Sequence, residues 1–283
     1  MNHLPGNFRW SFSKLAAFEH CPMSFYLEYV CHPDQNEEIP NYYAEYGSCA
    51  HKILEEFLKG DLPQFLLAEE WSSRYPEEVK CPPPPYPAGY ADKAYAQGLA
   101  FFETFNGFGD EWEVVSVEKK FVLNIQGHMV SGIADCVLRH KETGELWVID
   151  HKGKSKSSLK RDMPVYRNQL YLYALWCHTE LNQYPSKLSF HLFKDQEMVT
   201  EEFTKEGMDA TIKWIIDTIN KIEICDLFED WGTCISAGET KEPFFCKWVC
   251  GCNSFCERYQ EVHQISYANY LEKKALEAEM YGI

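Results

Sequence analysis

Two carboxylates and a lysine lie where two predicted neighbouring strands end. Asp135 closes the segment GIAD near the end of one strand, and Asp150 ends the next apolar run, LWVID, with Lys152 two residues further along. Residues two apart on an extended chain point to the same face. Converging carboxylates form an oxygen-rich site for Mg²⁺ or Mn²⁺, and Lys152 would then lie close to a scissile phosphate. Taken alone, an Asp-x-Lys at a strand end is more often a solvated turn.

A basic run, KGKSKSSLKR, follows Asp150 and His151. Its lysines at 154, 156 and 160 are candidates for contact with nucleic-acid phosphates, although such runs are usually exposed loops. The formal net charge of −16 argues against a nucleic-acid partner when it is taken alone, because phosphate binding usually needs a basic face. The basic run therefore stands out against an acidic chain. Divalent cations bound at the carboxylates would also make the local charge more positive.

Composition bounds the class of protein. The 283 residues are 45% apolar, which is enough for a sizeable core. No apolar run reaches the length of about 18 residues that a membrane span needs, and the first residues lack the pattern of a signal peptide. We therefore expect a cytoplasmic or otherwise intracellular protein, in which bunched cysteines are better read as metal or cluster ligands than as disulfides.

The periodicity of apolar residues predicts an α/β fold. Helices dominate up to about residue 106, and a long amphipathic helix and a final helix follow the strands. The predicted strands cover 113–123, 127–140, 146–150, 187–194 and 198–203, with a helix over 165–181. We expect a helical N-terminal region (1–110), a core (111–204) and a helical, cysteine-bearing C-terminal region (205–283).

Five segments resemble, in order, the motifs of the PD-(D/E)XK nuclease superfamily in its RecB-like branch. They are SFSKLAAFEHCPMSFYLEYV (11–30), GSCAHKILEEF (47–57), GIAD (132–135), VIDHK (148–152) and QLYLY (169–173). The resemblance covers about Ser11 to Cys256. Ala134 replaces the proline that the family usually has before the aspartate.

The resemblance implies a restriction-endonuclease-like core, a mixed central sheet flanked by helices. It implies a site in which His51, Asp135, Asp150 and the backbone carbonyl of His151 hold Mg²⁺ or Mn²⁺, and Lys152 assists catalysis. The alternative for His51, beside apolar residues, is a packed histidine. Glu118 on the preceding strand is a weaker candidate for the metal shell. The expected DNA contacts are Gln169, Tyr173, Tyr166, Lys154, Lys156 and Lys160.

Four cysteines fall within CKWVCGCNSFC (246–256). The resemblance to AddB-type and CRISPR-associated exonucleases implies a 4Fe-4S cluster held by Cys21, Cys246, Cys250 and Cys256. Three residues separate Cys246 from Cys250 where the family usually has two, and Cys252 could substitute for Cys250 as ligand. Zinc and coincidental free thiols are the alternatives, although the C-x₂-C pairs typical of zinc sites are missing here.

The resemblance thus implies a metal-dependent DNA nuclease, with exonucleolytic cutting of single-stranded DNA or of free ends as the expected activity. A catalytically silent DNA-binding or assembly subunit with a structural cluster is the alternative, and a zinc-stapled protein of unrelated activity is a third hypothesis. Replication, recombination, CRISPR adaptation and phage DNA processing are all compatible pathways.

Overall fold

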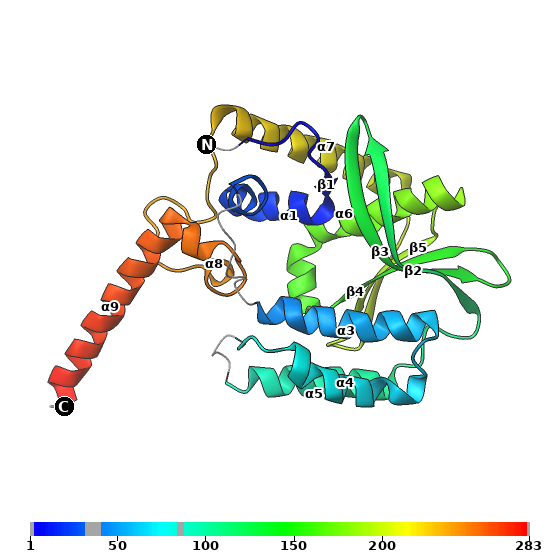
Figure 1. Cartoon of the computed structure of the whole chain (residues 1–283), viewed down its shortest axis with the longest axis horizontal. Helices are drawn as coiled ribbons and strands as arrows, with labels where there is room; N and C mark the ends of the chain where they lie inside the picture. The colour runs from blue at the N-terminus through cyan, green and yellow to red at the C-terminus, as the bar shows by residue number, and fades with distance from the viewer. Residues whose placement is uncertain (1–2, 32–40, 84–87, 282–283) are drawn as a thin grey trace. The chain divides into compact units, whose positions relative to one another are not determined.

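The computed structural model describes residues 3–31, 41–83 and 88–281 (Figure 1). The chain forms two compact units, which we call the sheet unit (7–16 and 42–217) and the cysteine unit (1–6, 17–41 and 218–283). No helix in the described part of the chain is both long enough and apolar enough to cross a membrane.

Within the described residues, the sheet unit contains one mixed sheet of six strands. Its centre is an antiparallel meander of β2 (Trp112–Ile125), β3 (His128–His140) and β4 (Leu146–Lys152). β5 (Lys187–Leu192) pairs parallel with β4, β6 (Glu197–Glu202) pairs antiparallel with β5, and the short β1 (Trp10–Ser11) pairs parallel with β3. This confirms the predicted α/β fold with a mixed central sheet.

A two-residue turn fixes the register of β2 against β3. Gln126 and Gly127 both have positive φ (50° and 95°), the backbone of a type I′ turn, which matches the twist of antiparallel strands. Ile125 therefore pairs with His128, and the same register continues back to Ser116, opposite Val137. The register shifts by one residue between Val114 and Ser116.

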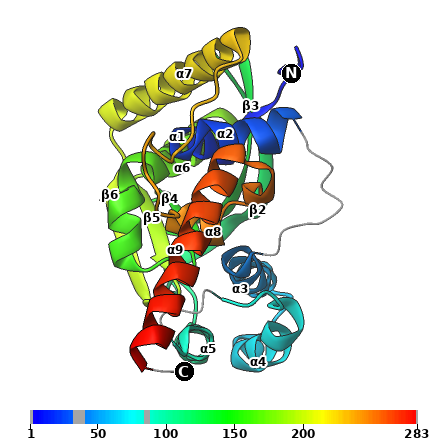
Figure 2. The same cartoon turned by 90° about the vertical axis from the view of Figure 1, so that its left-hand side faces the viewer.

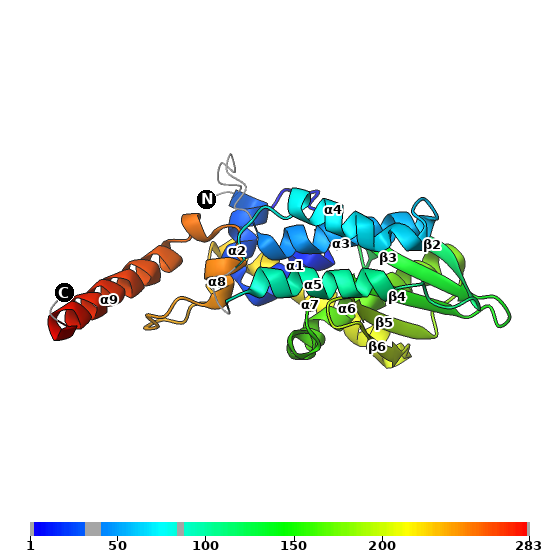
Figure 3. The same ribbon diagram turned by 90° about the horizontal axis from the view of Figure 1, so that it is seen from below.

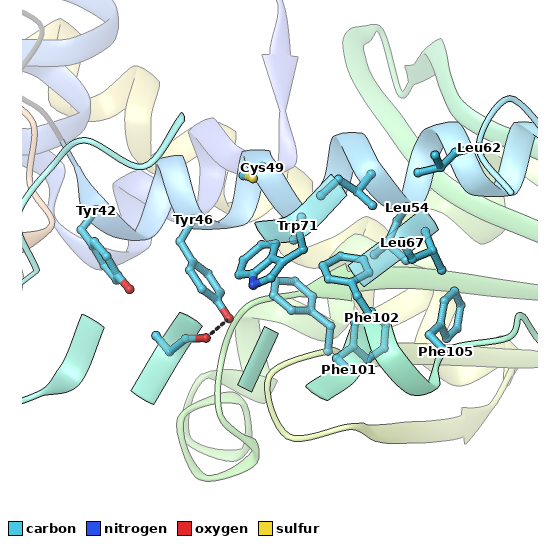
Figure 4. Close-up of a cluster of buried hydrophobic side chains, with 14 of the residues drawn as sticks. Tyr42, Tyr46, Cys49, Leu54, Leu62, Leu67, Trp71, Phe101, Phe102 and Phe105 are labelled. Carbon is cyan, nitrogen blue, oxygen red and sulfur yellow. Dashed lines mark hydrogen bonds between the residues drawn. The ribbon is translucent and has the colours of Figure 1, made fainter. Parts of the chain in front are cut away.

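Three helices form a layer in the sheet unit: α3 (Tyr42–Lys59), α4 (Leu67–Glu78) and α5 (Tyr90–Thr104). Figures 2 and 3 show them lying side by side. Their shared core is rich in aromatic rings, and Tyr46 at its centre donates a hydrogen bond to the carbonyl of Ala94 (3.0 Å; Figure 4). Gly98 lets α5 approach Trp71, because a Cβ at this position would lie 2.3 Å from the indole. This layer positions the face of α3 that carries His51.

The helix after β4 begins earlier than the sequence indicates. We expected a helix from residue 165 after a basic loop, but α6 spans Lys156–Leu181 and includes most of the basic run. Ser155 caps it, since its Oγ accepts a hydrogen bond from the backbone N–H of Ser158 (3.3 Å). Pro164 lies inside α6 without ending it. The cap therefore starts the helix nine residues earlier than the helical spacing indicated.

The cysteine unit joins both ends of the sequence. Two helices belong to both units along the chain: α1 (Phe12–His20) and α7 (Lys205–Phe228). The other helices of the cysteine unit include α2 (Pro22–Phe25), a π-helix (Tyr26–Cys31), α8 (Phe244–Trp248) and α9 (Glu257–Tyr281) (Figure 1). Cys21 separates α1 from α2, which begins at Pro22. Trp231 stacks on Phe25 and Tyr26, and the N–H of Met23 donates to the carbonyl of Gly232 (2.8 Å). The loop after α7 therefore packs on the first helices.

Candidate active site

A row of three carboxylates crosses three adjacent strands. Val117 pairs with Cys136 and Lys119 with Ala134, so Glu118 on β2 lies opposite Asp135 on β3. Cys136 pairs with Ile149, which places Asp150 on β4 opposite Asp135 on its other side. Asp150 is fully buried and Asp135 is nearly so. Like charges directly opposite each other destabilise a sheet, so a cation beside this row would stabilise it.

Glu118 has an unusual backbone. Its φ of 48° is left-handed, which is uncommon for a residue other than glycine and costs about 1 kcal/mol or more. Such strain is typical of functional sites, where the surrounding structure enforces it. The Gln126–Gly127 turn was the signal in the sequence that could have placed Glu118 opposite Asp135 and ranked it higher as a metal-shell candidate.

His51 reaches the carboxylates from α3. Its Nδ1 lies 3.6 Å from both Asp135 Oδ2 and Glu118 Oε1, and its Nε2 lies 2.9 Å from the carbonyl oxygen of His151. One ligand atom from each of His51, Glu118 and Asp135 lies within 4.8 Å of the others, which makes these residues a candidate metal site. An imidazole with carboxylates suits Mn²⁺ and similar divalent ions, so this donor set fits the expected metal.

A second network links Asp150 to α6. Lys152 Nζ lies 2.7 Å from Asp150 Oδ2 and donates a hydrogen bond to Gln169 Oε1 (2.9 Å). Gln169 Nε2 donates to the hydroxyl oxygen of Tyr173 (2.7 Å), and that hydroxyl donates to Asp150 Oδ1 (3.3 Å). The two α6 residues are one turn apart and thereby fix both the carboxylate and the amine. The structure brings these four predicted residues together.

Burial shifts the proton affinities of these groups. Desolvation, together with the charge of Asp135, raises the pKa of Asp150 to about 6, and desolvation raises the pKa of Asp135 as well. Burial opposes the charge on Lys152, but Asp150 and Asp135 outweigh it and raise the pKa of the amine. Burial likewise opposes the charge on His51, while Glu118 and Asp135 raise its pKa. The site therefore favours bound cations or protons.

His151 is held through both its backbone and its ring. Its N–H donates to Asp135 Oδ2 (2.9 Å), and its ring lies on the opposite face of the sheet, with Nδ1 3.0 Å from Nδ1 of His191 on β5. Burial lowers the pKa of both histidines, that of His191 to about 4. This neutral pair fixes the strand whose carbonyl faces His51, and the sequence analysis did not single out His191.

The histidine pair predicts a stability change with pH. An unfolded histidine has a pKa of about 6.5, so between pH 6.5 and 4 the unfolded chain binds a proton that folded His191 does not. The free energy of unfolding should therefore fall as the pH drops, by on the order of 3 kcal/mol from this group. His191→Gln should flatten that decline in urea titrations at several pH values. If His191→Gln had the same pH dependence of stability as wild type, the prediction would be contradicted. The control variant is His140→Gln, at the end of β3.

A family model described as the PD-(D/E)XK nuclease superfamily matches residues 9–257. The chain belongs to the PD-(D/E)XK nuclease superfamily. This membership indicates a metal-dependent nuclease that binds nucleic acid, and the mixed sheet with its flanking helices is the restriction-endonuclease-like core. Among solved structures, the crystal structure of SSO0001 is similar at 14% identity, over 87% of this chain and 96% of that chain, with a TM-score of 0.29. No curated protein matches the sequence.

Of the predicted DNA contacts of this PD-(D/E)XK protein, Tyr166 lies beside the site, while two of the three lysines are in ion pairs and one is exposed. Lys154 Nζ lies 4.2 Å from the centre of the Tyr166 ring and pairs with Asp162 (2.7 Å). The ring of Tyr166 is also 5.6 Å from Lys152 Nζ, which places it beside the carboxylates. Lys156 pairs with Glu197 (2.6 Å), and Lys160 is exposed on α6. Phosphates would have to compete with carboxylates for two of these lysines.

Glu118 offers a test of the metal site. In Glu118→Gly the left-handed backbone becomes unstrained, so the metal-free protein should gain about 1 kcal/mol of stability. The same variant loses a carboxylate, and Mn²⁺ should bind at least about tenfold more weakly. Calorimetric Mn²⁺ titration and urea unfolding measure the two effects. Glu118→Gln, which keeps the strain, is the control; equal Mn²⁺ affinity in all three proteins would exclude Glu118 as a ligand.

The cysteine unit brings the predicted cluster ligands into one region. Electrostatic interactions connect Cys21 with Cys250 and Cys256, and Cys250 with Cys252. A further thiol, Cys234, contacts Cys21 and Cys246, although it lies outside the bunched cysteines at 246–256. Among the described residues, no three cysteine sulfurs lie within 4.8 Å of one another.

Proposed function

We propose that this chain is a DNA nuclease of the RecB-like branch that uses Mg²⁺ or Mn²⁺ and degrades single-stranded DNA from its ends. The observation that supports this proposal best is the row of Glu118, Asp135 and Asp150, in which both aspartates are buried and which His51 and Lys152 flank. A purely structural core would not place three carboxylates side by side, because their mutual repulsion and desolvation oppose folding.

His51, Asp135, Asp150 and the carbonyl of His151 would hold the metal, with Glu118 as an additional ligand. A divalent ion there would lower the pKa of a bound water and neutralise charge on the reacting phosphate. Lys152 would orient the attacking water or stabilise the developing charge from beside Asp150. Gln169 and Tyr173 keep the amine and the carboxylate in place, and from the same helical face they would help to position the strand.

Further contacts to the substrate would come from Tyr166, Lys154, Lys156 and Lys160. Tyr166 lies closest to the catalytic amine, within 5.6 Å, where its ring could stack on an unpaired base. We propose that the three lysines bind the backbone on either side of the cleaved bond. These contacts, together with the family resemblance, support a single strand as the substrate.

We further propose a 4Fe-4S cluster held by Cys21, Cys246, Cys250 and Cys256, with Cys252 as the possible substitute for Cys250. The chemistry of the donor set fits, because the thiols form no disulfide and are buried or half-buried. Burial raises the pKa of Cys250 and Cys256, so these thiols would ionise at neutral pH only with metal ions bound beside them. The cluster would tie the end of α1 to the segment around α8, more than 200 residues later in the sequence.

The decisive test is a cleavage assay with Mn²⁺ on single-stranded DNA labelled at the 5′ or the 3′ end, on circular single strands and on duplex. We expect linear single strands to be shortened stepwise and circles to remain intact. Asp150→Ala should be inactive. If the wild-type protein binds DNA but cuts none of these substrates, the proposed nuclease activity is wrong and a catalytically silent DNA-binding subunit is favoured. Cleavage of the circular single strands would show that the protein is an endonuclease rather than an exonuclease.

A further inference from the structure

Cys234 lies between two of the proposed cluster ligands. Its backbone N–H donates to Cys21 Sγ (3.4 Å), and its own Sγ lies 3.4 Å from Cys246 Sγ. It comes from the loop between α7 and α8 (Figure 1), outside the cysteine-rich segment at 246–256.

The short distance between Cys234 and Cys246 limits their roles. The four ligands of a 4Fe-4S cluster bind four different iron atoms, which keeps their sulfurs well apart. Cys234 Sγ therefore lies too close to Cys246 Sγ for both to be ligands, and its thiol also exchanges a hydrogen bond with the thiol of Cys21. Cys246 shares its short segment with Cys250 and Cys256 and is the better ligand of the two. Cys234 is left beside it with a thiol hydrogen that can only point to a neighbouring acceptor.

We propose that Cys234 is a positioning residue that donates hydrogen bonds to two ligand sulfurs and thereby sets the reduction potential of the cluster. This inference rests on the proposed 4Fe-4S cluster. The backbone N–H would serve Cys21 Sγ and the thiol would serve Cys246 Sγ. Hydrogen bonds to ligand sulfur stabilise the more negatively charged reduced cluster. Losing one makes reduction harder, so the midpoint potential falls.

Three variants of the full-length, anaerobically purified protein test this role. Cys234→Ala removes the side-chain donor, Cys234→Ser keeps a hydroxyl donor, and Cys225→Ala removes a thiol on α7 elsewhere in the same unit. The readouts are iron and sulfide per chain, and the midpoint potential from an EPR-monitored redox titration. We expect all three to retain iron. Only Cys234→Ala should shift the potential to more negative values, and the serine variant should lie at or above wild type.

Two results would overturn the role of Cys234 alone. Loss of iron from Cys234→Ala, with the cluster intact in wild type, would make Cys234 a ligand. An unchanged potential in Cys234→Ala would show that its thiol does not act on the cluster. Wild-type protein without iron and sulfide would instead overturn the cluster itself, and this role with it.

Discussion

Replacing Lys152 by methionine should slow DNA cleavage by about 10²–10³-fold while leaving Mn²⁺ binding at least as tight as in wild type. Lys152 Nζ lies 2.7 Å from Asp150 Oδ2, where its charge serves the reacting phosphate but competes with a metal ion for the same carboxylate. Methionine keeps most of the apolar stem and removes only the charge. Single-turnover cleavage and calorimetric Mn²⁺ titration separate the two effects.

The matched control is Asp150→Asn, which has the same shape and lacks the carboxylate. It should lose both cleavage and most Mn²⁺ affinity, because a ligand is gone. Both variants should be compared at about pH 8, since the pKa of Asp150 is about 6 and rises further when its ion-pair partner is removed. If Lys152→Met lost Mn²⁺ affinity as severely as Asp150→Asn, the lysine would act by holding Asp150 in place rather than by serving the phosphate.

Cys21→Ser should destabilise the protein by on the order of 5 kcal/mol, which corresponds to about 10 °C or more in melting temperature. Cys21 is the only proposed ligand from the N-terminal half of the sequence, so losing it releases the cluster from the end of α1. Binding free energy that exists only in the folded protein adds directly to folding stability. Anaerobic thermal unfolding, followed by circular dichroism and by the visible absorbance of the cluster, measures the effect.

Cys49→Ser is the control for this prediction. Cys49 is fully buried in the sheet unit, so serine there introduces a buried hydroxyl without touching the proposed cluster, at about 1–3 kcal/mol. Visible absorbance should persist in this variant until it unfolds. Equal losses of stability in the two variants, with iron retained in both, would exclude Cys21 as a ligand.

The strands and the order of the motifs were predictable because they depend on local sequence. The pattern of apolar residues marked the three meander strands to within two residues at their ends. β4 was expected to end on Asp150, but the strand continues to Lys152. Asp135 and Asp150 were expected at the same end region of the sheet, and the register places them directly opposite each other. These features follow from periodicity and from short connections between neighbouring strands.

Other features depend on tertiary structure and were harder to predict. The start of α6 was missed because helical spacing was evident only from residue 165 and the cap at Ser155 is a weak signal. The partnership of His151 with His191 requires the parallel pairing of β4 with β5 across a whole helix. Cys234 lies in a loop without regular periodicity, and only the packing of that loop on the first helices brings it to Cys21.

The imidazole of His51 has one nitrogen against the backbone carbonyl of His151 and the other 3.6 Å from carboxylate oxygens of Asp135 and Glu118. The pKa values of His51 and Asp135 are both raised, so these two groups hold their protons more tightly than usual. An incoming divalent ion must displace those protons into solvent. The metal-free site therefore releases protons when it binds the ion, and its affinity for the ion should rise with pH. Lowering the pH should therefore release the ion, and it also lowers the stability of the fold through His191.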